Sequence, residues 1–319
     1  MKRITSLFLP ASVAVVLLLT IAGFCGKLSF ELDLLSHFRS QYALAGLICA
    51  VAAGLSRRPY VLIAGLACLL VNGVQLAPFL SIRGAAARGN AESKRIIFAN
   101  VDIRNRQFDR LVTLSGALAP DVAVFTEVDA EWAQHLSALT ERLPHVLSEP
   151  RADKFGMMLL SHVPILKQNV IELPGVLIPS VIFDVTVSEP EGPLRVIAAH
   201  SPAPVNQPGY DNRNKMLKRI SDMIPESDLP TVVVGDLNIT PWSPVFSEFL
   251  STSSLQNARA GRGILPTWPR NVLPLMIPID HCLTTPSIRI EDMTTTPEFG
   301  SDHLGVVCDI EQTEIAPHE

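Results

Sequence analysis

The stretch Thr231-Val-Val-Val-Gly-Asp-Leu-Asn238 decides the fold class of this chain. Residues 231–234 are all β-branched, so they predict a short strand of the kind that lies deep in a sheet covered on both faces. Side chains alternate along an extended chain, so Asp236 and Asn238 face the same way beyond this strand. Gly235 leaves room for the close approach of another backbone. We therefore expect a carboxylate and an amide together at the tip of a buried strand.

The rest of the chain after residue 93 mixes strands and helices in a way that predicts an α/β fold. Apolar runs predict strands at 95–101, 121–126, 155–161, 176–187 and 194–199, and around Ile279, Ile288 and Val306. Periodic apolar positions predict helices that run to Leu118 and that cover residues 131–143 and 210–223. Strands outnumber helices and arrive both in βα pairs and in consecutive runs. This mixture predicts two packed sheets with helices outside, an α/β four-layer sandwich.

Composition divides the 319 residues into an apolar N-terminal part and an acidic remainder. Residues 1–82 contain almost no polar stretch, whereas from Gly89 onward 18 Lys and Arg stand against 29 Asp and Glu. An acidic body without a basic patch repels polyanions, which argues against general nucleic-acid binding. Cys282 and Cys308 lie on two late predicted strands, where they either pack as thiols or form a disulfide. No C-x-x-C spacing occurs, so we expect no structural zinc site.

Residues 1–82 predict a membrane region of about three transmembrane helices. The apolar runs 7–24 and 60–80 are each near the roughly 20 residues that cross a bilayer. The run 42–55 is shorter and spans only if residues nearer His37 join its helix. A cleaved signal peptide is the alternative for the first run, although its length and the apolar segments after it favour a span.

The positive charges of the N-terminal part predict its orientation. Lys2-Arg3 and Arg57-Arg58 mark the ends that stay in the cytoplasm. Three spans then make a multi-pass protein of the cytoplasmic (inner) membrane and place the later domain on the extracytoplasmic, periplasmic side. If 42–55 does not cross, that domain is cytoplasmic instead. Residues 83–93, rich in Ala, Gly and Arg, are typical of a linker.

Four short motifs follow in a fixed order, and three of them come directly after an apolar run. They are Phe125-Thr-Glu127-Val, Gly235-Asp-Leu-Asn238, Ile279-Asp-His281 and Ser301-Asp-His303. Carboxylates and an amide collected at strand ends form a group of hard oxygen ligands, and a histidine beside them can move protons. The combination is typical of a metal-dependent site that cleaves phosphate esters.

On these motifs, residues 94–312 resemble the catalytic domain of the endonuclease/exonuclease/phosphatase superfamily, with 313–319 as a tail. The resemblance implies a DNase I-like two-sheet sandwich, in-line attack of water on phosphorus, and a divalent metal, usually Mg²⁺ with Mn²⁺ or Ca²⁺ as alternatives. This chain departs from the family at Thr126, where Gln is usual. The segment Thr267-Trp-Pro269 resembles one in membrane-anchored bacterial members, where it either lines the cleft or packs structurally.

The resemblance implies a set of metal and substrate ligands. Glu127, at the tip of a buried strand, is the expected metal ligand, with help from Asn100, Asp102 and Asp302. A turn cap is the alternative for Asn100, and a solvated loop acid is the alternative for Asp102. Asn100 and Arg213 are also expected to contact the substrate phosphate, although a surface salt bridge is equally compatible with Arg213.

The resemblance also implies the catalytic residues, which are His200, Asp236, Asn238, Asp280 and His303. Asp236 aligns or deprotonates the attacking water, while Asn238 holds the phosphate. His200 contacts the scissile phosphate or protonates the leaving oxygen. His303 has the intrinsic pKa to move protons near neutrality, and a hydrogen bond to Asp280 fixes its tautomer.

Three functions compete. The first is a membrane-anchored, metal-dependent phosphodiesterase or phosphatase acting on a lipid head group or another small phosphate ester, with the bilayer and its substrate as partners and no obligate protein partner. The second is a nuclease on the same scaffold, which the acidic domain disfavours. The third is a catalytically inactive membrane-bound binding protein, against which the full set of acids and histidines argues. The natural substrate, the number of metal ions and the oligomeric state do not follow from the sequence.

Overall fold

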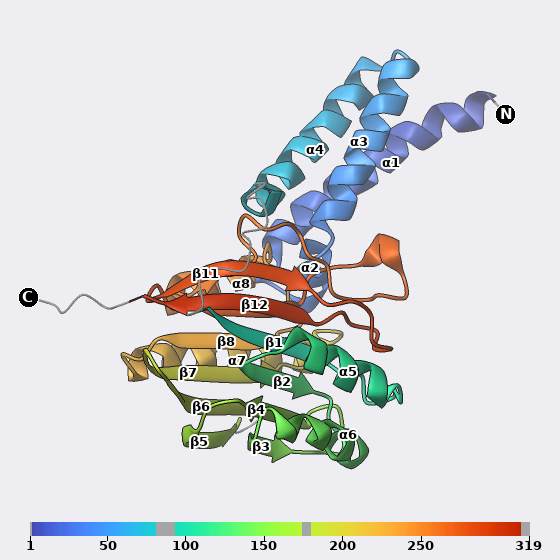
Figure 1. Ribbon diagram of the computed structural model, residues 1–319. Coiled ribbons are helices and arrows are strands. Elements are labelled where there is room, and N and C mark those ends of the chain that lie inside the picture. Colours follow the sequence, from blue (N-terminus) through green and yellow to red (C-terminus); the bar gives the residue numbers. More distant parts are fainter. Residues whose placement is uncertain (1, 81–92, 174–179, 314–319) are drawn as a thin grey trace, which may run out of the picture.

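The computed structural model describes residues 2–80, 93–173 and 180–313, with side chains described from Phe8 onward (Figure 1). Residues 83–92 of the expected linker, 176–179 of an expected strand and 314–319 of the expected tail lie outside these ranges. Within the described residues the chain forms two six-stranded sheets. Helices cover the outer face of each sheet, and the N-terminal helices extend away from them.

The first sheet has the strand order β11-β12-β1-β2-β4-β3. Its strands are β1 (Lys94–Asn100), β2 (Val122–Thr126), β3 (His145–Glu149), β4 (Met157–Ser161), β11 (Ile288–Thr295) and β12 (Val306–Gln312). The second sheet has the order β5-β6-β7-β8-β10-β9. Its strands are β5 (Ile165–Glu172), β6 (Val181–Glu189), β7 (Gly192–His200), β8 (Thr231–Asp236), β9 (Gln256–Asn257) and β10 (Asp280–Thr284).

The helices fall into an N-terminal group and two groups that flank the sheets. The first comprises α1 (Lys2–Ala22), η1 (Gly23–Cys25), α2 (Phe30–Ser36), α3 (Arg39–Leu55) and α4 (Pro59–Leu80). Helices α5 (Phe108–Leu118), α6 (Ala130–Leu136) and η2 (Ser137–Glu141) belong to the first sheet. Helices α7 (Gln207–Met223), η3 (Ile224–Glu226) and α8 (Pro244–Ser253) belong to the second, and η4 (Leu273–Leu275) lies in a long loop.

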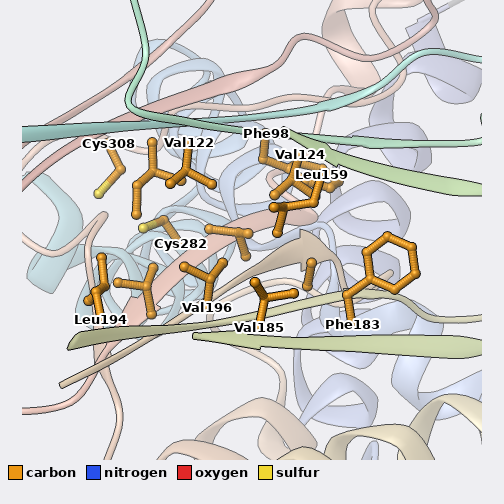
Figure 2. Close-up of a cluster of buried hydrophobic side chains, with 14 of the residues drawn as sticks. Phe98, Val122, Val124, Leu159, Phe183, Val185, Leu194, Val196, Cys282 and Cys308 are labelled. Carbon is orange, nitrogen blue, oxygen red and sulfur yellow. The ribbon is translucent and has the colours of Figure 1, made fainter. Parts of the chain in front are cut away.

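The main hydrophobic core fills the space between the two sheets. Figure 2 shows Phe98, Val122, Val124 and Leu159 of the first sheet opposite Phe183, Val185, Leu194 and Val196 of the second. Two further apolar clusters lie under the flanking helices, one beneath α5 and α6 and the other beneath α7 and α8. The layers are therefore helix, sheet, sheet and helix, which confirms the predicted four-layer α/β sandwich.

Cys282 and Cys308 face each other from opposite sheets in this core (Figure 2). Both are buried free thiols. The contact between them, together with burial, raises the pKa of the Cys308 thiol. Of the two alternatives for these cysteines, the structure shows packing rather than a disulfide.

Two parallel strand pairs place the polar motifs at one edge of the sandwich. Strand β1 pairs in parallel with β2, and β7 pairs in parallel with β8. Each pair is joined by a crossover helix, α5 or α7, which is the usual way to connect parallel strands. A Cβ atom on Gly235 would lie 2.0 Å from the carbonyl oxygen of Ala199, so only glycine fits at this point of β8. This close approach confirms the expectation for Gly235.

The N-terminal helices have the length and composition of a membrane anchor. Residues Phe8–Cys25 and Pro59–Leu80 are each long and apolar enough to cross a bilayer. Helices α2 and α3 meet that test together, although a bend of 61° separates them. The described residues therefore contain two candidate spans, or three if the bent pair is one span.

The short helix α2 docks the N-terminal helices onto the sandwich through buried polar contacts. Asp33 Oδ2 lies 2.8 Å from Arg213 Nη2, and both side chains are fully buried. Ser243 donates a hydrogen bond of 2.8 Å to Asp33 Oδ1. Trp242 Nε1 donates one of 3.0 Å to the carbonyl oxygen of His37, so this tryptophan is part of a buried contact.

Helix α4 and the loop before α2 also contact the sandwich. Gly261 and Gly263 donate backbone hydrogen bonds of 2.9 and 2.8 Å to the carbonyl oxygens of Pro78 and Phe79. The Tyr210 hydroxyl donates one of 3.0 Å to the carbonyl oxygen of Gly26. The N-terminal helices and the sandwich thus share a buried interface in addition to the covalent connection.

Replacing Asp33 by Asn is expected to lower the thermal unfolding midpoint of the full-length protein in detergent. The change leaves the Arg213 guanidinium buried without its countercharge, at a cost of about 3–5 kcal/mol. The matched control is Lys27→Gln, which removes an exposed ion pair of 2.7 Å to Glu248 at the same interface. Exposed pairs contribute roughly 0–1 kcal/mol. Equal midpoints for the two variants would contradict the role of Asp33.

Candidate active site

The carboxyl ends of β1, β2, β7 and β8 bring predicted site residues together at one edge of the sandwich. Asn100, His200 and Asp236 are the last residues of β1, β7 and β8, and Glu127 directly follows β2. Asn100 Nδ2 lies 3.2 Å from Glu127 Oε1 and 3.1 Å from Asp236 Oδ2, and donates to both. A single buried amide therefore joins the carboxylates of the two sheets.

Glu127 is held in place on both of its oxygens. Its side chain is buried, Oε2 accepts a hydrogen bond of 3.1 Å from the backbone N–H of Ile103, and Lys154 Nζ lies 3.3 Å from Oε1. Glu127, Asp102 and Asn238 all have positive φ angles, of 61°, 54° and 48°. Such backbone conformations are uncommon outside glycine and concentrate at functional sites.

Asp102 is near the site, but its carboxylate is paired within its own loop. Strand β1 ends at Asn100, and Asp102 is in the left-handed region. Its carboxylate accepts hydrogen bonds of 3.1 Å from the backbone N–H and from Nε of Arg104. The hydrogen bond and the charge of Asp102, with the charge of Asp302, raise the pKa of Arg104.

Asp236 lies between two imidazole rings. Its Oδ2 is 3.5 Å from His200 Nε2 and 3.8 Å from His303 Nε2. Its Oδ1 accepts a hydrogen bond of 3.0 Å from the backbone N–H of Asn238. Burial, and then the neighbouring charge of Asp280, raises the pKa of Asp236 to about 7. This carboxylate can therefore exchange a proton near neutral pH.

His303 and Asp280 form a buried hydrogen-bonded pair. Nδ1 of His303 lies 3.0 and 3.2 Å from the two oxygens of Asp280, which orients the ring and turns Nε2 toward Asp236. Burial opposes a charged ring, but the charge and hydrogen bond of Asp280, with the charges of Asp236 and Asp302, raise the pKa of His303 to about 9. The arrangement is the expected one, in which a carboxylate fixes the tautomer of a histidine.

His200 and Asn238 stand beside Asp236 on the second sheet. The expectation that Asn238 continues an extended chain from Asp236 is wrong, because β8 ends at Asp236 and Asn238 is in the left-handed region. Burial lowers the pKa of His200, so its ring is neutral at physiological pH and acts as a hydrogen-bond partner. Asn238 Nδ2 donates a hydrogen bond of 2.8 Å to the carbonyl oxygen of Ser201. An amide nitrogen carries two hydrogens, so one N–H of Asn238 remains for another acceptor.

Asp302 lies at the rim of the group, against a tryptophan. Trp268 Nε1 donates a hydrogen bond of 3.1 Å to Asp302 Oδ2, and the centroid of its ring is 6.2 Å from that of His303. Trp268 therefore contacts the site, whereas Thr267 is fully buried and accepts a hydrogen bond of 3.2 Å from the backbone N–H of Ile279, so the segment combines the two alternatives given for it. Asp302 Oδ1 is 4.0 Å from His303 Nε2, and Oδ2 is 3.9 Å from Arg104 Nη2.

The structure corrects the expectation that Arg213 contacts substrate. Its guanidinium is fully buried against Asp33, and its Nη1 donates a hydrogen bond of 3.3 Å to the carbonyl oxygen of Asn238. Arg213 does form an ion pair, but a buried one with the N-terminal helices instead of the surface pair considered as the alternative. Through this hydrogen bond, the Arg213 side chain stabilises the loop that carries Asn238.

Two cationic residues of the site, Arg104 and Lys154, escaped the sequence analysis. Arg104 follows Asp102 by two residues, and this proximity to a predicted acid is the signal that would have identified it. Lys154 precedes β4 in a loop with no motif, so its contact with Glu127 appears only in three dimensions. His281, the last residue of the third motif, is fully buried, and its Nε2 contacts the carbonyl oxygen of Ile239, so it packs in the interior.

The donor set fits a hard divalent cation. Ligand atoms of Asp236, Asp280 and His303 lie within 4.8 Å of one another, in the part of the chain that the structure describes. Both Asp280 oxygens already face His303 Nδ1, and a protonated histidine cannot bind a metal. The predicted ligands Glu127, Asp102 and Asp302 do not form such a group in the described residues. Each instead contacts a cationic side chain, Lys154 or Arg104, whose place a metal ion would take. Burial, and then the charge of Asp280, raises the pKa of Asp236, and a nearby cation would favour its charged form.

Comparisons with known proteins agree with this architecture. A model described as the Endonuclease/Exonuclease/phosphatase family matches residues 90–303. An endonuclease/exonuclease/phosphatase structure from Beutenbergia cavernae DSM 12333 has 21% identity and a TM-score of 0.56, covering 70% of this chain and 72% of its own. No curated protein sequence matches the chain.

Two further solved structures show the range of chemistry on this fold. D. rerio TDP2 complexed with a single-strand DNA product is 18% identical, with a TM-score of 0.57 over 69% of this chain and 99% of that one. Sphingomyelinase C from Streptomyces griseocarneus is 14% identical, with a TM-score of 0.52 over 68% of this chain and 99% of that one. At these identities the likeness shows the fold, and it confirms the predicted DNase I-like sandwich.

Adding Mg²⁺ is expected to raise the unfolding midpoint of the full-length protein, because a ligand that binds only the folded state stabilises it. Glu127→Gln should remove most of that rise, since it replaces a charged oxygen ligand by a neutral one. The matched control is Glu131→Gln, a half-exposed acid four residues further on that pairs with Arg106. If Glu127→Gln and Glu131→Gln respond to Mg²⁺ alike, Glu127 is not a ligand.

The His303 pair is expected to make the stability of the EDTA-treated protein depend on pH. Because the folded pKa of about 9 exceeds the ordinary value of 6.5, the contribution of His303 is fully present below 6.5 and is lost as the pH rises through 9. The difference in stability between wild type and His303→Asn should fall by on the order of 3 kcal/mol across this window. Unfolding midpoints measured across that range check this, and a constant difference would contradict it.

Proposed function

Because the chain belongs to the endonuclease/exonuclease/phosphatase family, we propose that it is a membrane-anchored phosphoesterase that requires a divalent metal. The observation that carries the proposal is the joining of Glu127 and Asp236 through Asn100, beside the Asp280–His303 pair. An oxygen-rich metal site and a proton-transfer pair stand together there, as hydrolysis of a phosphate ester requires.

Glu127, Asp102 and Asp302 are the residues that would hold the cation. Asn100 would instead orient Glu127, because its amide nitrogen faces that carboxylate and its Oδ1 accepts a hydrogen bond of 3.0 Å from the backbone N–H of Asp102. The donor atoms of the three acids are oxygens, which favours Mg²⁺, with Mn²⁺ or Ca²⁺ as alternatives. When bound, the cation offsets the negative charge of the phosphoryl oxygens. Arg104 contacts Asp102, and Lys154 contacts Glu127. When the cation takes their place, these two cationic side chains would bind the oxygens of the substrate phosphate.

The acid and base roles follow from the geometry around Asp236. The water oxygen bonds to phosphorus as the phosphorus–oxygen bond to the leaving group breaks. Asp236 accepts the proton of that water beside the protonated ring of His303, which Asp280 orients, and the leaving oxygen takes its proton from solvent. The neutral ring of His200 and the second N–H of Asn238 bind the phosphoryl oxygen on which charge accumulates.

A lipid head group or another small phosphate ester is the substrate class that we favour. The sphingomyelinase C among the similar structures acts on such a lipid by its name, whereas TDP2 was solved with a DNA product. The acidic balance after Gly89 and the apolar N-terminal helices support the first class over the second. A nuclease on the same scaffold remains the alternative function.

We place the protein in the cytoplasmic membrane with three spans and the sandwich on the extracytoplasmic side. Two observations support this orientation. The turn with Arg57 and Arg58 joins α3 to α4 at the end of the helices that lies away from the sandwich (Figure 1). The N-terminus, with Lys2 and Arg3, lies at that same far end, and positive residues remain in the cytoplasm.

Purified full-length protein is expected to hydrolyse bis-p-nitrophenyl phosphate in the presence of Mg²⁺ and to lose this activity in EDTA. Glu127→Gln and His303→Asn should each lower kcat by about 100-fold or more, because they remove a metal ligand and the charged ring beside the base Asp236. The matched controls are Glu131→Gln and His162→Asn, which change exposed residues of the same types.

The same assay separates the competing functions. Equal rates for wild type and the two site variants would favour the inactive binding protein. Parallel reactions with p-nitrophenyl phosphate and with a single-stranded DNA oligonucleotide distinguish a phosphatase and a nuclease from a phosphodiesterase that acts on small esters.

A further inference from the structure

The loop between β9 and β10 leaves the candidate site and returns to it. It passes Trp268, which contacts Asp302, and it ends at Asp280, which contacts His303. A backbone bridge between Trp268 and Ile277 closes the base of this excursion. Within the segment that this bridge closes, residues 270–276 form a separate loop, which we call the apolar loop. Its tip is thus connected to site residues through a few residues on either side.

The apolar loop exposes large hydrophobic side chains. Val272, Leu273 and Leu275 are 45%, 72% and 48% exposed. The chain carries no charged residue between Arg270 and Asp280. A single exposed leucine needs no explanation, but a cluster of them on one loop of a folded protein marks an interaction surface.

The apolar loop is attached to the first turn of α3. Gln41 Nε2 donates hydrogen bonds of 3.2 and 3.1 Å to the carbonyl oxygens of Pro274 and Met276. In Figure 1 the orange loop that includes η4 extends beside the lower ends of the blue helices. The loop therefore lies where the helical bundle meets the sandwich.

The face of α3 that carries Gln41 is an exposed apolar stripe. The residues that follow on this face, at the spacing of helical turns, are Leu44, Ile48, Val51 and Leu55. They are 57%, 59%, 55% and 84% exposed, as expected of a helix surface that contacts lipid. Because Gln41 joins the loop to this stripe, the loop and the lipid-facing side of α3 form one continuous apolar surface.

We propose that the apolar loop inserts into the interfacial region of the bilayer beside α3, and that the site accordingly takes an amphiphilic phosphate ester from the membrane surface. The first half of this proposal rests only on the exposed side chains and their continuity with α3. The second half rests on the proposed function. A bilayer is favoured over a protein partner because the apolar surface continues along a candidate membrane span.

The membrane contact is tested by labelling, without reference to activity. Full-length Cys25→Ser protein with Leu273→Cys is labelled with an environment-sensitive nitrobenzoxadiazole dye and reconstituted in vesicles of phosphatidylcholine and phosphatidylglycerol. The other cysteines are buried, so the new thiol is the reactive one. The control label is at Leu166→Cys. Leu166 is 58% exposed, and its strand β5 lies far from the N-terminal helices (Figure 1).

The dye at position 273 should emit at shorter wavelength than the dye at 166, and nitroxide-labelled lipids in the vesicles should quench it more strongly. Equal emission and equal quenching at the two positions would overturn the membrane contact. Emission that shifts to shorter wavelength without quenching by lipid would also overturn it, since a protein partner or a second copy would then cover the loop.

The substrate half is tested with two esters that differ only in their tails, methyl p-nitrophenyl phosphate and dodecyl p-nitrophenyl phosphate. With Mg²⁺ and the same vesicles, Leu273→Asp should lower kcat/KM for the dodecyl ester by about tenfold, the effect of losing one buried leucine. It should leave hydrolysis of the methyl ester unchanged, which also shows that the variant is folded. Leu166→Asp is the control and should change neither rate.

The outcomes separate the two proposals. If wild type hydrolyses neither ester, the proposed function fails, while the labelling result still decides the membrane contact. If wild type hydrolyses both esters but Leu273→Asp affects them equally or not at all, the proposed function stands and the presentation of substrate by the membrane is overturned.

Discussion

Asn100 donates hydrogen bonds to both Glu127 and Asp236, and the candidate site depends on this junction between the two sheets. Glu127 follows a strand of the first sheet and Asp236 ends one of the second. Two carboxylates that approach each other in a buried place repel, and a shared amide donor reduces the cost of their burial. The parallel pairs β1–β2 and β7–β8 make the junction possible, because each pair ends at the same edge of the sandwich.

The charges around this junction are only partly balanced by the protein. Asp280 has His303, while Glu127 has Lys154 and Asp102 has Arg104 as a cationic partner. Asp236 has no such partner beyond its two imidazole neighbours, and its pKa is raised to about 7. Lys154 and Arg104 are well exposed, so their attraction is weakened by solvent. A buried group of acids with weakly held cations is suited to exchange those cations for a metal ion and a substrate phosphate.

The segment that follows β8 connects this site to the N-terminal helices. Asp236 and Asn238 face the site, and Trp242 and Ser243, only a few residues later, contact α2. Arg213 contacts both sides, since it pairs with Asp33 and donates to the carbonyl oxygen of Asn238. Removal of the N-terminal helices would leave the Arg213 guanidinium without its countercharge beside a site loop. The sandwich and the N-terminal helices are therefore one packed unit, and the site has a set position relative to those helices.

The sequence by itself determined the two-sheet sandwich, the apolar N-terminal helices and the motif residues, because buried strands need runs of apolar residues and charged side chains at the ends of such runs stand out. It missed β3 and β5, which are edge strands with little burial and no alternating pattern, and it missed α8 despite a capping Ser243 and the proline after it. Only the tertiary structure decided that Arg213 faces Asp33, that Lys154 reaches Glu127, and that the apolar loop adjoins α3. The reason is physical: a charged or apolar side chain has the same local pattern whichever distant partner it meets, and the partner is set by packing.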